Sequence, residues 1–142
     1  MLRLAFFRHA EGVGASLRDI NSLQAELMAK LLPIRPSIVY SSPYDKAVET
    51  ARVIAKVKKS SYATLSELAP AIASFEAIAR YVRDGAVFVG HSPSIEAIVT
   101  ALIGGGNIKL SPGGFALVEA ARYAYGEGAL VFLANPEFAM LG

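Results

Sequence analysis

The sequence predicts a single α/β domain over residues 1–142, built on a mostly parallel sheet. Short apolar runs rich in β-branched or aromatic residues alternate with longer stretches of helical period. Hydrophobic residues make up 54% of the chain and charged residues 18%, which is typical of a sheet covered on both faces, or of a subunit that buries surface against a partner. Because no repeat, linker or low-complexity segment interrupts the alternation, we expect one domain.

Each apolar run predicts a strand, and each periodic stretch after the first four of these runs predicts a helix. The strands are expected at 2–8, 37–41, 61–66, 86–90, 114–120 and 129–134, and the helices at 21–32, 43–57, 71–83 and 93–103.

Residues that favour helix ends set the boundaries of these helices. Asn21 with Gln24 forms a potential capping box after the Gly-containing loop 11–14. Ser42-Pro43 and Ser92-Pro93 each place an N-cap serine before a proline, whose missing N–H is harmless in the first turn. Asp45 extends the first of these into a capping box. Prolines at 33 and 36 and glycines at 104–106 predict two helix ends.

Composition excludes several classes of function. With 14 Lys and Arg against 12 Asp and Glu, the net charge of +2 predicts no nucleic-acid partner. The chain has no Cys and only two His, far apart in sequence, so we expect neither a metal site nor a cofactor. No apolar run approaches the length of a membrane span or a signal-peptide core, which predicts a cytoplasmic protein without a membrane partner. A homo-oligomer is possible.

Both histidines directly follow predicted strands. His9 comes after 2–8 and His91 after 86–90. In a mostly parallel sheet these positions are the carboxyl ends of strands, where doubly wound folds bind ligands. The sequence therefore predicts that two versatile side chains share one edge of the sheet.

Positive charge gathers near the same edge. Arg8 precedes His9, and Lys46 lies in the first turn of the helix expected after Ser42-Pro43. A cation there opposes the helix dipole, while the free N–H groups of a helix N-terminus attract anions. Arg8, His9, Lys46 and His91 therefore predict a cationic pocket, for which phosphate is the simplest ligand. No carboxylate cluster accompanies them, which disfavours magnesium-dependent phosphoryl transfer.

Four segments resemble motifs of the histidine phosphatase superfamily, also called phosphoglycerate mutase-like. Phe7-Arg8-His9-Ala10-Glu11 resembles its Arg-His-Gly/Ala motif, and Val89-Gly90-His91-Ser92-Pro93 its Gly-His-Asn/Ser segment. The run 41–51, Ser-Ser-Pro-Tyr-Asp-Lys-Ala-Val-Glu-Thr-Ala, is similar to Ser-Ser-Pro-x-x-Arg-Ala-x-x-Thr-Ala, and Leu65-Ser66-Glu67-Leu68 to Leu-x-Glu. The short chain most resembles the SixA-type phosphohistidine phosphatases, which implies a three-layer αβα sandwich with a mixed, mostly parallel sheet.

The resemblance implies a metal-independent phosphatase. His9 would be the nucleophile and carry a covalent phosphohistidine intermediate that water then hydrolyses. Arg8, Lys46 and His91, together with Ser92, would bind the phosphoryl oxygens. Glu67 would protonate the leaving group, although it could equally be a surface acid near a helix start.

The resemblance leaves the substrate open. Lys46 stands where the family usually has Arg, which keeps the charge but loses the bidentate fork. Glu67 leads almost directly into the next predicted helix, so no insertion roofs the pocket, and an open site favours a phosphorylated side chain of another protein as the substrate. A small phosphate ester is the first alternative. A phosphate-recognition module without turnover is the second.

Overall fold

The structure, a computed structural model, describes residues 1–11 and 19–140, and most of the predicted loop 11–14 therefore lies outside the described residues. Within them, no helix has the length and apolar character needed to cross a membrane. The strands are β1 (Leu2–Arg8), β2 (Ile38–Ser41), β3 (Tyr62–Thr64), β4 (Ala86–Gly90), β5 (Phe115–Ala120) and β6 (Gly128–Ala134), and the helices are α1 (Asp19–Leu31), α2 (Asp45–Lys58), α3 (Ser94–Ile103) and α4 (Pro136–Ala139).

The six strands form one mixed sheet in the order β3-β2-β4-β1-β5-β6. The pairs β3–β2, β2–β4 and β4–β1 are parallel. The pairs β1–β5 and β5–β6 are antiparallel, so the last two strands form the antiparallel side of the sheet, with β6 at its edge. Strands β1, β2 and β4 therefore end at the same edge.

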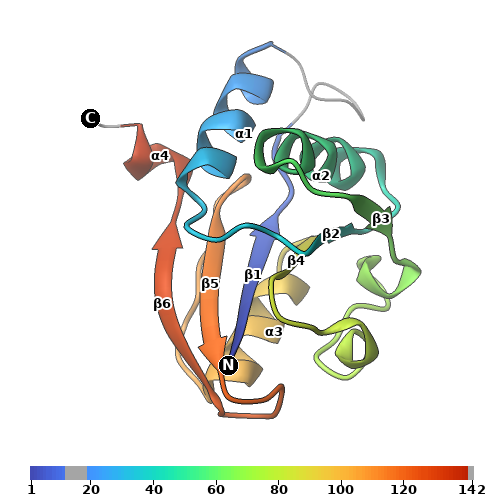
Figure 1. The fold of residues 1–142 in the computed structure, drawn as a ribbon, viewed down its shortest axis with the longest axis vertical. Helices are drawn as coiled ribbons and strands as arrows, with labels where there is room; N and C mark the ends of the chain where they lie inside the picture. The colour runs from blue at the N-terminus through green and yellow to red at the C-terminus, as the bar shows by residue number, and fades with distance from the viewer. Residues whose placement is uncertain (12–18, 141–142) are drawn as a thin grey trace.

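Alternate side chains of β1 supply two separate cores, which makes the domain a three-layer αβα sandwich. Ala5 and Phe7 are buried in a cluster with α1 and α2. Leu4 and Phe6 are buried in the opposite cluster with α3. Figure 1 shows α1 and α2 on one side of the sheet and α3 on the other. Because both faces of β1 and β4 are covered, the sheet fixes the residues that follow these strands.

The predicted strands and three of the four predicted helices are confirmed to within a few residues. The strand predicted at 86–90 matches β4 at both ends, and Gly104 ends α3 in the left-handed conformation, as expected. The short helix α4 was not predicted.

The helix predicted over 71–83 is wrong, because this segment forms turns and one short 3₁₀ helix, η2 (Ala79–Tyr81), and a second 3₁₀ helix, η1 (Ser66–Leu68), precedes it. Tertiary contacts hold it in this shape. Phe75 stacks on Tyr123 with 4.2 Å between ring centroids, and the Tyr123 hydroxyl donates to the Phe75 carbonyl. Ile78 is fully buried in the α3-side core. These contacts outweigh the segment's helix propensity.

The predicted N-terminal caps of three helices are also wrong. Helix α1 already includes Asn21, so the capping box with Gln24 does not form. Helix α2 begins at Asp45 with Tyr44 at the N-cap, and α3 begins at Ser94 with Pro93 at the N-cap. The hydroxyls of Ser42 and Ser92 are instead used at the sheet edge, in the contacts described below.

Candidate active site

The carboxyl ends of three neighbouring parallel strands bring the predicted residues together. Arg8 of β1 lies opposite Gly90 of β4, and the His9 N–H donates to the Gly90 carbonyl at 2.9 Å. Ser42, just after β2, donates its backbone N–H to the Val89 carbonyl at 3.0 Å. The backbone ladder thus continues one residue past each strand. It places His9, Ser42 and the residue after Gly90 side by side.

The two histidine rings are direct neighbours. Their centroids lie 4.9 Å apart, with the ring planes at 64°. Some 80 residues of chain separate His9 from His91, and the parallel pairing of β1 and β4 brings them to the same place. The sequence-based expectation that both occupy one edge is met.

The hydrogen bond at Nδ1 of His9 defines which nitrogen can react. Nδ1 lies 3.0 Å from the Ala10 carbonyl oxygen, which can only accept, so Nδ1 carries the proton. The lone pair of the neutral ring is then on Nε2. This arrangement orients a nucleophilic nitrogen away from the backbone.

Thr50 of α2 fixes the backbone that holds His9. The buried Thr50 hydroxyl accepts from the Ala10 N–H at 2.9 Å and donates to the Lys46 carbonyl at 2.8 Å. Ala10 is thereby joined to the first turns of α2. The same threonine couples the position of His9 to the helix that carries Lys46.

Burial and neighbouring cations keep His9 neutral. Burial lowers the pKa of His9 most, and the charges of Lys46 and Arg8 lower it further. The Ala10 hydrogen bond, second in size to burial, and the charge of Glu11 oppose this shift without reversing it. Burial, together with the charge of His9, lowers the pKa of His91 to about 4. Both rings are therefore neutral at pH 7, the state that an attacking imidazole requires.

Arg8 offers an unused donor in this region. Its Nη1 donates to the Leu110 carbonyl at 2.9 Å, which holds the guanidinium in place. Its Nε is buried and has no hydrogen-bond partner among the described residues. A buried donor without a partner is costly unless a ligand completes it, and a phosphoryl oxygen suits this position.

Lys46 brings a second positive charge to His9. It lies in the first turn of α2, half-buried, and it forms no ion pair with any residue that the structure describes. Its charge lowers the pKa of His9. Lys46 and Arg8 together give the edge the positive field that the sequence predicts.

Ser42 holds the ring of His91. Its hydroxyl oxygen lies 2.8 Å from Nε2 of His91, and it accepts a weaker bond from the Tyr44 N–H at 3.3 Å. The Tyr44 ring meets the other side, with centroids 5.1 Å apart at 70°, and Tyr44 is 56% exposed. His91 is thus fixed between a buried hydroxyl and an exposed aromatic ring.

Ser92 follows His91 at the same edge, but its hydroxyl already has a partner. It donates to Oε2 of Glu96 at 2.8 Å. The same carboxylate oxygen accepts from the Leu110 N–H at 3.4 Å. The predicted phosphate contact of Ser92 therefore requires this hydroxyl to leave Glu96.

Glu67 lies in η1 and is tied to residues other than the histidines. Oε2 of Glu67 accepts from the Tyr81 hydroxyl at 2.8 Å and from Arg80 Nη2 at 2.6 Å. These two bonds, that of Tyr81 first, lower the pKa of Glu67 to about 2. The carboxyl group is therefore ionised at neutral pH, and a proton donor must hold its proton at working pH. In this arrangement, Glu67 does not meet that requirement.

Across the described ranges, no three His, Asp or Glu side chains gather in a way that could hold a metal ion.

Comparison with solved structures identifies the architecture. A structure of the protein histidine phosphatase SixA with tungstate superposes with a TM-score of 0.81 at 19% identity, over 96% of this chain and 99% of that one. This chain has the histidine phosphatase fold. The predicted fold class is thereby confirmed.

Other structures with the histidine phosphatase fold act on different phosphate compounds. A mycobacterial glucosyl-3-phosphoglycerate phosphatase with VO3 matches with a TM-score of 0.72 at 14% identity, over 95% of this chain and 99% of that one. A phosphoserine phosphatase mutant from Entamoeba histolytica with phosphoserine matches at 0.70 and 14%, over 99% and 100%. No family model matches the chain, and no curated protein matches it.

Three residues of this edge were not predicted as functional: Ser42, Tyr44 and Thr50. All three lie within the segment 41–51 that carries the Ser-Ser-Pro motif. The Ser-Ser-Pro motif is therefore the sequence feature that could have identified these three residues. Ser42 was interpreted as a helix cap, and no role was assigned to Tyr44 or Thr50.

Proposed function

We propose that this chain is a phosphatase in which His9 forms a covalent phosphohistidine intermediate, and that its substrate is phosphohistidine on another protein. The observation that carries the proposal is the state of His9. Its Nδ1 is bound to a carbonyl, its Nε2 carries the lone pair and has no hydrogen-bond partner among the described residues, and its ring is neutral. A neutral imidazole beside two cations is suited to attack on phosphorus.

In the first step, Nε2 of His9 attacks the phosphorus, and the bond from phosphorus to the leaving nitrogen of the substrate breaks. The phosphoryl group passes to His9, and the electron pair of the broken bond goes to the substrate imidazole. In the second step, water attacks the phosphorus, the bond to Nε2 breaks, and the protons of the water leave with inorganic phosphate. His9 returns to its neutral state.

The cations stabilise the charge on the transferring group. Nε of Arg8 is a buried donor with no described protein partner, and Lys46 adds a charge from α2. Donors that are already in place for phosphoryl oxygens lower the barrier, because they need no reorganisation during the reaction. In the same proposal, His91 and Ser92 also contact the phosphoryl oxygens.

The ionised state of Glu67 favours phosphohistidine over a phosphate ester. A phosphorylated imidazole whose second ring nitrogen carries a proton leaves as neutral imidazole, so transfer to His9 needs no proton donor. An alkoxide is far more basic and must be protonated as it leaves. Glu67, with its pKa lowered to about 2, is a poor donor for that step.

A small phosphate ester is the second candidate, because proteins of the same fold include a phosphoserine phosphatase and a glucosyl-3-phosphoglycerate phosphatase. For this chain, such a substrate would require Glu67 to release Tyr81 and Arg80, or its leaving group to take a proton from water.

The decisive experiment measures phosphate release from a phosphohistidine-bearing protein, without added metal, by the intact chain and by His9→Ala. We expect release by the intact chain, no release by the variant, and phosphate trapped on His9 when the intact chain is quenched and analysed by mass spectrometry. Phosphoserine, tested in parallel, should be hydrolysed much more slowly.

Two other outcomes would contradict the proposal in different ways. Faster release from phosphoserine would keep the phosphatase and replace the substrate. No release from either compound, with tungstate still bound in titration calorimetry, would make the chain a phosphate-recognition module.

A further inference from the structure

Strand β6 forms one side of the sheet and is open along its outer edge. It pairs with β5 only, and no described backbone hydrogen bond outside that ladder involves residues 128–134. Figure 1 shows β6 at the margin of the sheet, with α4 projecting past its upper end. The free N–H and C=O groups of such an edge can pair with another strand.

The side chains of β6 do not protect this edge. The strand reads Gly-Ala-Leu-Val-Phe-Leu-Ala and contains neither a charge nor a proline, the residues that commonly prevent edge pairing. Leu130, Val131, Phe132 and Leu133 are each 37% to 47% exposed. The β5–β6 ladder contains one β-bulge, a feature that can hinder edge pairing. The extra residue of this bulge is Val131, opposite Leu117 and Val118, and it is apolar.

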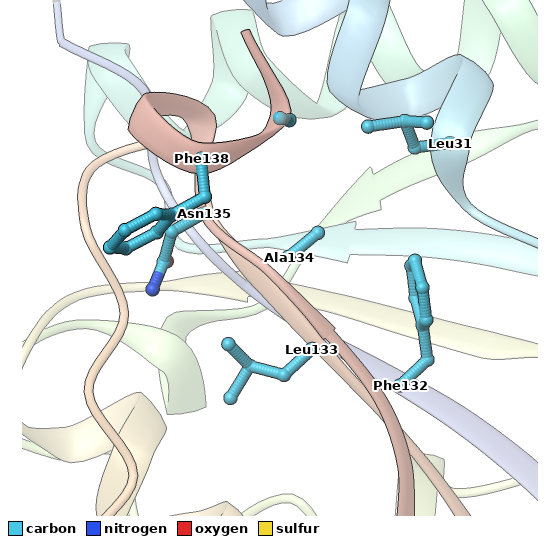
Figure 2. Close-up of a pocket in the computed structure, with 7 residues that line it drawn as sticks. Leu31, Phe132, Leu133, Ala134, Asn135 and Phe138 are labelled. Carbon is cyan, nitrogen blue, oxygen red and sulfur yellow. The ribbon is translucent and has the colours of Figure 1, made fainter. Parts of the chain in front are cut away.

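A hollow of about 480 Å³ continues this apolar surface onto two helices. Figure 2 shows Leu31 of α1 and Phe138 of α4 on either side of the β6 side chains that form its floor. Phe138 is 70% exposed. We call β6 together with Leu31 and Phe138 the β6 surface.

The exposed apolar area of the β6 surface approaches the lower end of what protein–protein interfaces bury. A large apolar side chain carries about 200 Å² of surface, so the exposed fractions of the large apolar members of the β6 surface amount to on the order of 500 Å² in each copy. The largest apolar patch on a monomer is typically about 300–600 Å², and a standard interface buries about 800 Å² on each partner. The backbone edge of β6 supplies part of the difference.

We propose that β6 is the interface of a homodimer, in which the β6 strands of two copies lie side by side and antiparallel about a twofold axis. The lack of charge on β6 favours a second copy as the occupant, since an uncharged apolar strand offers nothing to attract a charged partner and is complementary to itself. Antiparallel pairing of identical strands is closed by its symmetry, so it stops at two copies.

The dimer leaves both candidate active sites open. Strand β5 separates β6 from β1, and His9 and His91 follow β1 and β4. A protein substrate could therefore reach each copy independently. The proposal does not depend on the phosphatase activity, and it can be tested without a substrate.

Sedimentation equilibrium of the full chain, from low micromolar to near-millimolar concentration, tests the proposal. We expect a monomer–dimer equilibrium with no larger species. Hydrogen exchange should show the amides of 128–134 becoming slower as the dimer forms. A monomer at every concentration would overturn the proposal, as would open-ended polymers.

The variant Val131→Lys places like charges near the twofold axis and should weaken dimerisation by about tenfold or more. Leu23→Lys is the matched control, because Leu23 is a more exposed leucine on α1, outside the β6 surface. It should leave the dimer intact. If Val131→Lys is folded by circular dichroism and dimerises as tightly as the unchanged chain, the interface lies elsewhere and the proposal is wrong.

Discussion

The Ser42 hydroxyl oxygen lies 2.8 Å from Nε2 of His91, so the residue before Pro43 supports an imidazole on another strand. The contact exists because β2 and β4 are parallel neighbours, with Ser41 in register with Val89. Ser42 is fully buried, and its hydroxyl therefore has few alternative partners. This bond fixes the His91 ring within 4.9 Å of the His9 ring.

Replacing Ser42 with alanine should therefore reduce activity without unfolding the chain. A neutral hydrogen bond contributes about 1 kcal/mol, which corresponds to a loss of roughly five- to tenfold in kcat/KM. The measurement is phosphate release from the phosphohistidine protein, with the exposed Ser61→Ala as the control. Equal activity in the two variants would mean that Ser42 does not position His91 for the reaction.

Thr50→Val should destabilise the fold as well as the site. The variant leaves the Ala10 N–H without its acceptor, and a buried unpaired donor costs about 1–3 kcal/mol of unfolding free energy. Thr100→Val is a matched control, because the Thr100 hydroxyl also donates to the carbonyl four residues earlier but accepts from no described N–H. Urea unfolding should show the larger loss for Thr50→Val, and Thr50→Ser should restore most of it.

Lys46→Met should raise the pKa of His9, because the charge of Lys46 lowers it in the intact chain. The acid limb of the kcat/KM profile would then move to higher pH, since protonated His9 cannot attack. Lys46→Arg keeps the charge and should leave the limb in place. Activity measured between pH 4 and 8, with the His9 ring titrated by NMR, checks the shift. An unchanged limb in Lys46→Met would show that the two side chains do not interact.

Unfolding free energy should fall in mild acid because of His91. Its folded pKa of about 4 lies below the ordinary value of 6.5, so the unfolded chain binds the proton more readily. This contribution to stability is fully present above pH 6.5 and is lost as the pH falls through 4. Urea midpoints across this window should decline less steeply in His91→Asn. An identical decline in both proteins would contradict the assigned cause.

Glu67→Gln should change phosphohistidine hydrolysis by no more than about twofold, because an ionised carboxyl group supplies no proton to the leaving group. Tyr81→Phe removes the first of the two bonds that lower the Glu67 pKa, and it serves as the companion variant. A loss of tenfold or more in Glu67→Gln, with Tyr81→Phe fully active, would restore Glu67 as the proton donor.

Local pattern was sufficient to predict most strands and the edge at which the chemistry lies. Strand β4 is buried at every position, and its sequence is therefore an uninterrupted run without charged residues that ends just before His91. The boundaries of such a run can be located from residue type alone. The turns at 71–83 were not predictable in this way. Their shape depends on the stacking of Phe75 against Tyr123, a residue 48 positions away.

The amino-acid sequence is sufficient to predict the alternation of strands and helices, the apolar character of β6, and the positions next to strand or helix ends of Arg8, His9, Lys46 and His91. These properties follow from residue type and local spacing. Long-range contacts are needed for the histidine rings to meet, for Ser42 to bond a ring rather than cap a helix, and for Glu67 to bond Tyr81 and Arg80. Each of these depends on the distance between residues far apart in the chain, and strand order and burial set that distance.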